Sequence, residues 1–225
     1  MSGVDLGPLW LTLRLAAIVT FLLLLLAAPL AWWLSQTRSR AKPVIEALTA
    51  LPLVLPPTVL GFYLLILFSP KSTFGAFWVQ ATGETLTFSF TGLVIASMLY
   101  SLPFAVQPLQ AAFESLGRAP MEAAAMLRAS PFDRFFTVAL PLAKRGFLTA
   151  TVLSFTHTLG EFGVVLMVGG NIPGKTKVIS IAIYEHVETI RYADAHVLSA
   201  ILLVFSFVTL LIVYSLNRQA ARITG

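Results

Sequence analysis

The sequence predicts an all-α integral membrane protein, a single domain over residues 1–225 with about five transmembrane helices. Hydrophobic residues make up 57% of the chain and charged residues only 11%, a balance that a soluble globule of 225 residues cannot accommodate. Five apolar runs are long enough to cross the hydrocarbon, which takes roughly 20 residues of helix. They lack strand-like alternation, and open sheet edges cannot be satisfied in lipid. The expected spans are residues 9–34, 47–68, 90–113, 146–168 and 197–216.

The first span lacks a basic amino-terminal region and is longer than the core of a signal peptide, so we expect it to remain in the membrane. The second contains Pro52, Pro56 and Pro57, which remove backbone donors and predict a broken helix. The third carries hydroxyls near a proline, at Ser97 and Ser101. Broken helices often line transport pathways.

Basic residues are distributed unequally between the two sides of the membrane. Ten lysines and arginines lie on the side of the loop 114–145, and four lie on the other side. By the positive-inside rule this loop is cytoplasmic, with the amino terminus outside and the carboxyl terminus inside. The net charge of +5 is therefore mostly a topology signal. Because the basic residues are scattered without exposed aromatics between them, a nucleic-acid surface is not expected.

The polar loop 114–145 predicts two short helices joined by a turn, an arrangement suited to docking. The first helix is expected to open at Pro120, since proline is favoured in the first turn. Ser130 and Asp133 have capping-box spacing for the second helix, which Pro141 is expected to end.

This loop resembles the Glu-Ala-Ala loop of bacterial ABC import permeases, with Arg128 where that family usually carries Gly. In the family it is a coupling helix that lies in a groove of a separate cytoplasmic ATPase and transmits its opening and closing to the membrane helices. The resemblance implies that ATP and Mg²⁺ belong to the partner, and that this chain is no enzyme and holds no cofactor. The implied coupling residues are Glu122, Ala123, Ala124, Leu127, Arg128, Ala129, Phe135, Leu140 and Pro141.

Two further stretches resemble the molybdate branch of this family, to which sulfate and thiosulfate permeases are close. One is Thr158 to Gly163 with Asn171 to Thr176 after it, and the other is Leu51 to Val59. The resemblance implies import of molybdate, with tungstate as a further candidate cargo, in the bacterial inner membrane. It also implies that the outer face meets a soluble molybdate-binding protein. The implied external-loop residues are Asn171, Pro173, Gly174 and Thr176.

The segment from Gly169 to Thr176 also matches the P-loop pattern letter for letter. A P-loop requires a buried strand before it, whereas this segment follows a membrane span and faces the side without ATP. We therefore expect a glycine-rich outer loop, followed by a short interfacial helix within residues 175–195. The isolated histidines His186 and His196 do not form a metal site, and the absence of cysteine excludes disulfides.

Polar and small residues within the spans predict a translocation pathway. Glu161 lies deep in the fourth span, where an ionisable group is a functional candidate, but its carboxylate would repel a dianion. We expect a structural or gating role for Glu161, with His157 one turn earlier as its partner. Gly160 and Gly163 would permit close helix approach. The candidate pathway residues are Pro56, Pro57, Thr58, Ser97, Ser101, Thr158, Gly160, Glu161 and Gly163.

Five spans make a thin bundle, so the pathway is expected at the interface of a homodimer. Two rival functions share part of this prediction. A sulfate or thiosulfate permease would use the same mechanism, and a passive anion channel would transport without ATP and give no role to Glu122. A membrane enzyme is the weakest alternative, because no nucleophile and base, metal cluster or nucleotide site converges in the spans.

Overall fold

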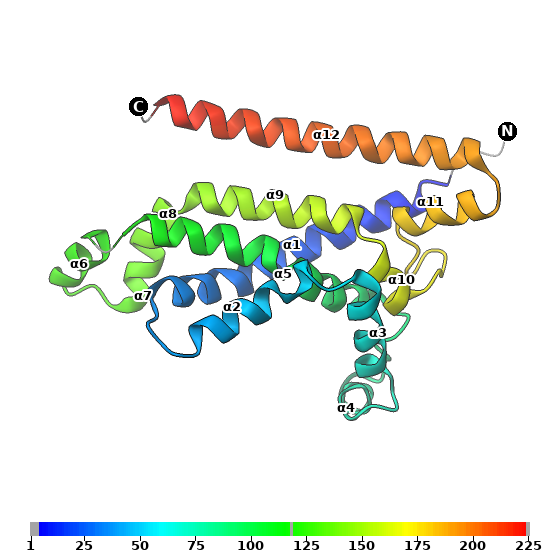
Figure 1. The fold of residues 1–225 in the computed structure, drawn as a ribbon, viewed down its shortest axis with the longest axis horizontal. Helices are drawn as coiled ribbons and strands as arrows, with labels where there is room; N and C mark the ends of the chain where they lie inside the picture. The colour runs from blue at the N-terminus through cyan, green and yellow to red at the C-terminus, as the bar shows by residue number, and fades with distance from the viewer. Residues whose placement is uncertain (1–4, 118, 224–225) are drawn as a thin grey trace.

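The computed structural model describes residues 5–117 and 119–223, and within these residues it contains helices and no strand (Figure 1). Arg118, counted above as a loop cation, lies outside the described residues, as do the side chains of Arg218 and Arg222. The elements are α1 (Gly7–Gln36), α2 (Lys42–Ala50), η1 (Leu51–Leu53), α3 (Pro57–Phe68), α4 (Thr73–Thr82), α5 (Phe90–Ser115), α6 (Ala119–Met126), α7 (Pro131–Asp133), η2 (Arg134–Ala139), α8 (Leu140–Leu142), α9 (Lys144–Gly160), α10 (Gly163–Gly169), α11 (Ile179–Glu188) and α12 (Tyr192–Ile223).

Three long helices, α1, α5 and α9, form the centre of the bundle (Figure 1). Small residues such as Ala27 and Ala31 of α1 and Ala105 of α5 are fully buried, which lets the helices approach closely. Near the amino-terminal ends of α1 and α5, the Arg14 guanidinium lies 4.9 Å from the centre of the Phe90 ring. A cation over an aromatic face is a favourable way to place a charge near lipid.

Three helices of the described chain, Gly7–Gln36, Phe90–Ser115 and Tyr192–Leu211, are each long and apolar enough to cross a membrane. Two bent pairs raise the number of spans to five if each pair counts as one. The first pair joins Lys42–Leu53 to Pro57–Phe68 at 108°, which confirms the broken second span predicted from its prolines. The second joins Pro131–Leu142 to Lys144–Gly160 at 74°.

The fourth span departs from the sequence prediction. Instead of one helix over 146–168, α9 ends at Gly160 and α10 begins at Gly163. Glu161 has extended backbone, with φ −66° and ψ 133°, so it lies in a break and not inside a helix. The placement of Glu161 on one helical face with His157 was therefore wrong. The flanking glycines favour a break, because glycine is a poor helix former.

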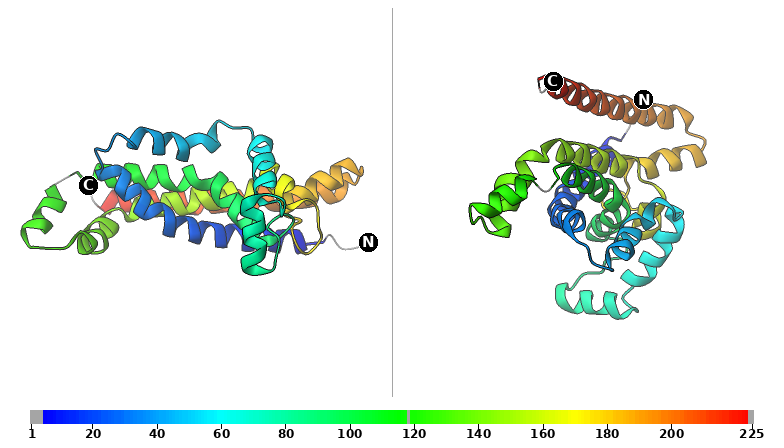
Figure 2. Two further views of the ribbon diagram at one scale, coloured as in Figure 1. Left: turned by 90° about the horizontal axis from the view of Figure 1, so that it is seen from below. Right: turned by 60° about the vertical axis from the view of Figure 1, so that its left-hand side comes forward.

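The predicted helical hairpin is present and protrudes from one end of the bundle (Figure 2). Ser130 and Asp133 form the expected capping box at the start of α7. The expectation that Pro141 ends the helix was wrong, since a π-helical segment passes into α8 and the bend falls at Ala143. Pro141 lies in α8 directly after the π-helical segment, so the continuous helix tolerates a residue that lacks a backbone donor.

Two features were not anticipated. The helix α4 lies beyond the second span, with its first turn capped by the Ser72 hydroxyl, which accepts from the amide of Gly75. The last helix, α12, runs along the periphery of the bundle (Figure 1 and the right-hand view of Figure 2). Its membrane-length window is only 11% buried, against 56% for α5.

Candidate functional site

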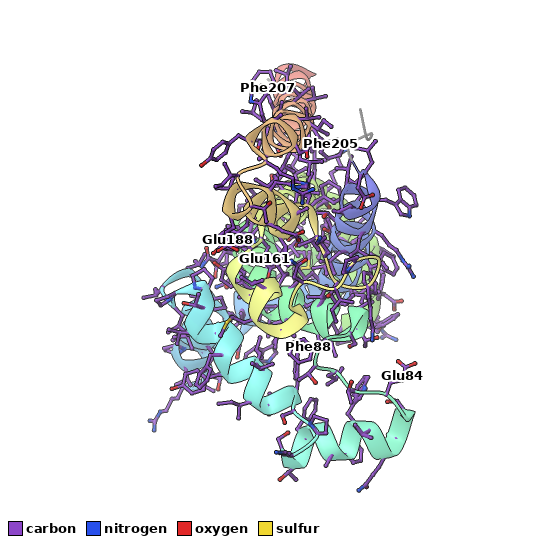
Figure 3. The ribbon with its side chains drawn as sticks, turned by 90° about the vertical axis from the view of Figure 1, so that its right-hand side faces the viewer. Glu84, Phe88, Glu161, Glu188, Phe205 and Phe207 are labelled. Atoms are coloured by element: carbon purple, nitrogen blue, oxygen red, sulfur yellow. The ribbon has the colours of Figure 1, made fainter. Side chains whose placement is uncertain are left out.

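A cavity of about 520 Å³ lies where the two broken spans meet. The start of α3, the middle of α5, the end of α9 and the start of α10 surround it. Figure 3 shows Glu161 within the body of the molecule, whereas Phe205 and Phe207 lie on the peripheral α12. The lining residues are Pro57, Thr58, Tyr100, Thr156, His157, Gly160, Glu161, Phe162 and Gly163.

The close contact of α3 with α10 depends on Gly163. A Cβ atom added there would lie 2.7 Å from Cβ of Pro57, so any larger residue would separate the two helix starts. This confirms the expected close approach at Gly163. At Gly160 the same expectation was wrong, because a Cβ there would meet no atom within 4 Å. Gly160 faces the cavity.

Glu161 is the charged residue of this cavity and is 4% exposed. The buried hydroxyl of Ser97 is the side chain that interacts with this carboxyl, although the pair lacks the geometry of a well-formed hydrogen bond, and no other donor reaches either carboxyl oxygen in the described part of the chain. The backbone of Glu161 is held, because the Ser180 hydroxyl of α11 donates to its carbonyl at 2.6 Å. A buried carboxyl with so little compensation is a costly arrangement that ordinary packing does not require.

His157 is fixed by α5 and not by Glu161. Its Nδ1 lies 2.9 Å from the hydroxyl of Ser101, and its ring stacks on Phe104 with centroids 4.0 Å apart. The Ser101 hydroxyl also lies 3.1 Å from that of Thr158. Ser101 and Thr158 thus connect α5 to α9 immediately behind the cavity wall.

The structure therefore brings together most of the pathway residues expected from the sequence. Pro57, Thr58, Gly160, Glu161 and Gly163 line the cavity. The other four lie beside it: Pro56 precedes α3, Ser97 neighbours Glu161, and Ser101 and Thr158 form the polar link.

Sequence reasoning did not assign Tyr100, Thr156, Phe162 or Ser180 to this region. Tyr100 lies one turn after Ser97 and one position before Ser101, so helical spacing on α5 gave a signal for it. Ser180 reaches the Glu161 carbonyl because the loop between α10 and α11 folds back toward the helix break. The local sequence around either residue does not predict this path.

The residues expected to couple to an ATPase lie on the hairpin, at the opposite end of the bundle from α10 and α11 (Figure 1). Met121 is buried and anchors α6, while Glu122 and Ala123 are exposed and Leu127 is 84% exposed. Ala124 and Ala129 are half-buried, and Pro141 is exposed. Half-buried Phe135 packs against Trp32 and Phe113, with centroids 5.8 Å and 6.1 Å apart, and Leu140 is likewise half-buried.

Arg128 closes the turn between the hairpin helices with φ 60°. This left-handed backbone conformation favours glycine, which explains why related permeases usually carry Gly at the position of Arg128. Arginine adopts it at some conformational cost.

The predicted outer loop, residues 170–178, is held by its own polar contacts. Thr176 is fully buried, its hydroxyl donates to the Gly169 carbonyl at 2.7 Å, and it accepts from the Ile172 amide at 3.3 Å. Asn171 donates to Glu185 at 2.7 Å, and Lys177 lies 2.6 Å from the same carboxylate.

Of the other two external residues, Pro173 is exposed and Gly174 has φ 72°. The segment follows the helix α10, and no strand precedes it in the described chain, so the structural context of a P-loop is missing here. Within the described residues no cluster of three or more histidine, aspartate or glutamate side chains could hold a metal.

A helical bundle with membrane-length helices, a protruding hairpin and a cavity that contains Glu161 at two helix breaks is an arrangement typical of membrane transport subunits. Residues 24–222 match the family described as binding-protein-dependent transport system inner membrane component, and the chain belongs to this family.

Similarity extends to particular proteins. The chain is 54% identical to the molybdenum transport system permease protein ModB of Azotobacter vinelandii, over 98% of both chains. It is 34% identical to the sulfate transport system permease protein CysT of Escherichia coli strain K12, over 86% of this chain and 68% of that one. Its fold resembles that of a chain in the crystal structure of a bacterial alginate ABC transporter in complex with a pentasaccharide-bound periplasmic protein. The TM-score is 0.76 at 18% identity, covering all of this chain and 81% of the other.

Proposed function

We propose that this chain is the permease subunit of an ATP-driven importer that carries molybdate into the cytoplasm by alternating access. The observation that carries the proposal is its identity with a molybdenum permease over nearly the full length of both chains. The sulfate permease is a more distant relative at 34% identity and remains the second candidate, with the same mechanism.

The cavity at the two helix breaks supports a pathway for an oxyanion. Thr58 and Thr156 place hydroxyls on its wall, and the amino-terminal end of α3, with the positive end of its dipole, begins there. An anion coordinated by hydroxyls and amides is bound weakly enough to be released. Because an ionised Glu161 would repel a dianion, we assign this residue a gating role at the α9–α10 break.

The hairpin supports coupling to a separate ATPase. The exposed face of α6 offers Glu122 and Met126, and Leu127 follows in the turn; Met126 and Leu127 are 87% and 84% exposed. Apolar side chains this exposed on a protruding segment mark an interaction site. ATP and Mg²⁺ would bind the partner, whose closure would move the hairpin and, through α9, the break at Glu161.

The proposed assembly contains two copies of this chain in the inner membrane, two ATPase subunits and one extracytoplasmic binding protein. The whole chain acts as one permease domain, with the hairpin on the cytoplasmic side, the amino terminus outside and the carboxyl terminus inside. The tied outer loop, with Asn171, Pro173 and Gly174, would face the binding protein.

The test is uptake of labelled molybdate into vesicles containing this chain, its ATPase and its binding protein. Uptake that requires ATP and resists excess sulfate supports the proposal, and tungstate competition defines the width of selectivity. Equal inhibition by sulfate would move the assignment to the sulfate branch. Flux without ATP that survives Glu122→Ala would instead show a passive channel.

A further inference from the structure

An apolar groove of about 720 Å³ lies on the flank of the bundle, larger than the cavity around Glu161. It runs between the second half of α1 and the hairpin, and volumes of about 300–1,000 Å³ are typical of ligand sites. Its walls include Phe21, Leu25 and Trp32 of α1 and Phe132, Phe136 and Phe147 of the hairpin and α9. The groove is thus almost entirely hydrocarbon in character.

A smaller, more polar pocket of about 220 Å³ adjoins this groove at the hairpin end. The two share Trp32 and Pro131, and the second pocket adds Gln36 and Arg134. The Nε atom of Arg134 is buried and has no hydrogen-bond partner in the described part of the chain. The neighbouring carboxylate of Asp133 is taken up by the Ser130 cap, at 2.6 Å from its hydroxyl.

We propose that the groove and the adjoining pocket together bind one anionic phospholipid of the surrounding leaflet. An acyl chain would lie along the phenylalanines, and the phosphate would accept from the Arg134 guanidinium. The apolar part belongs to a helix long and apolar enough to cross the membrane, so lipid is the medium that reaches it. The unpartnered cation at one end specifies a negative headgroup, and guanidinium matches phosphate geometry well.

The site would also steady the hairpin. Phe132 and Phe136 lie on the hairpin and Phe21 on α1, so a bound chain would bridge elements separated by more than a hundred residues. The six-residue π segment Arg134–Ala139 places Arg134 at the edge of this contact, and such segments frequently occur at functional sites. The effect on coupling rests on the proposed function, but binding itself does not.

Tryptophan quenching by brominated lipid tests the proposal, because Trp32 lines both pockets. A variant retaining only Trp32 is reconstituted into phosphatidylcholine vesicles that contain brominated phosphatidylglycerol or, at equal mole fraction, brominated phosphatidylcholine. We expect the anionic lipid to be enriched about fivefold at Trp32. A variant retaining only Trp33, which is 40% exposed on the next position of α1, reports the bulk lipid.

Charge variants then locate the headgroup. Arg134→Gln should abolish the preference and Arg134→Lys should keep most of it, while Arg40→Gln removes an equal charge from an exposed loop position and should leave it unchanged. A preference that survives Arg134→Gln would overturn the site. Equal quenching by both lipids in the unsubstituted background would overturn it too, even if Arg134→Gln failed to fold.

Shielding of Trp32 from both lipids would show that a second copy or another protein covers the groove, which also contradicts the proposal. The measurement needs no ATPase, binding protein or molybdate. Its failure would therefore leave the proposed transport function untouched, and loss of transport would leave the lipid site untouched.

Discussion

The two ends of the bundle are built in opposite ways. At one end, the loop after α10 buries Thr176 completely, and Glu185 contacts both Asn171 and Lys177. At the other end, α6 has one buried anchor, Met121, and leaves Leu127 84% exposed. The loop after α10 is held by its own polar contacts, whereas the hairpin, within the described residues, has few polar contacts to the bundle and presents apolar side chains on a protruding segment. This contrast supports the proposal that a partner docks at the hairpin.

The largest expected effect is at the docking end. Leu127→Asp should weaken binding of the ATPase by about 2–4 kcal/mol, the cost of losing a central apolar contact, and should abolish ATP-driven uptake. Binding of the purified ATPase to the reconstituted permease measures it. Ile190→Asp is the matched control, an equally apolar residue, 74% exposed, on the segment that leads from α11 to α12. If both variants bind the ATPase equally well, the hairpin is not the docking surface.

The next effect concerns the rigid junction of the broken spans. Gly163→Ala should lower the free energy of unfolding by about 1–3 kcal/mol, since the new methyl overlaps Pro57. Gly160→Ala adds the same methyl three residues away, where nothing lies within 4 Å, and should cost little or slightly stabilise. Thermal unfolding of the two variants decides the matter. Equal destabilisation would mean that α3 and α10 do not pack as described.

At the outer loop, Thr176→Val should cost about 1–2 kcal/mol, because the buried Gly169 carbonyl loses its donor. Thr176→Ser keeps the hydroxyl and should retain most of the stability. Chemical unfolding compares the two variants, and hydrogen exchange at the Ile172 amide shows whether the loop has opened. A loop that stays protected in the valine variant would contradict the role given to this hydroxyl.

The smallest effect is a pH dependence of the same loop. Hydrogen bonds from Lys177 and Asn171 hold the pKa of Glu185 below its usual value. The resulting stability is present above the ordinary glutamate pKa and is lost as the pH falls through the lowered value. Partly exposed pairs of this kind contribute at most about 1 kcal/mol. Glu185→Gln should flatten the acid limb of the unfolding profile, and an unchanged limb would remove Glu185 as its cause.

Sequence reasoning predicted the features that local chemistry encodes. The prolines of the second span indicated its break, and the capping box at Ser130 indicated the start of α7. Sequence reasoning missed the break at Glu161. The fourth apolar run is long enough to cross the membrane as one helix, and the flanking glycines were the sole local sign of an interruption. Sequence reasoning also placed His157 and Glu161 on one helical face, because they are four residues apart. That spacing no longer applies once the helix ends at Gly160, before Glu161.

Contacts between distant segments were the other limit. Ser180 of α11 donates to the carbonyl of Glu161, and the hydroxyl of Ser101 on α5 lies close to the ring of His157 on α9. These contacts depend on how whole helices pack, so no window of the sequence contains them. The roles of the coupling and pathway residues stay predictions, with the cavity as their structural support.

The peripheral α12 has a consequence for how the protein is made. Because its membrane-length window is only 11% buried, its insertion depends on its own apolarity, a mean hydropathy of 2.0, and hardly on the helices before it. The central helices α1, α5 and α9 can therefore finish packing while the last span is still entering the bilayer. The final span is thus the part of this protomer whose place in the membrane depends least on the rest of its own chain.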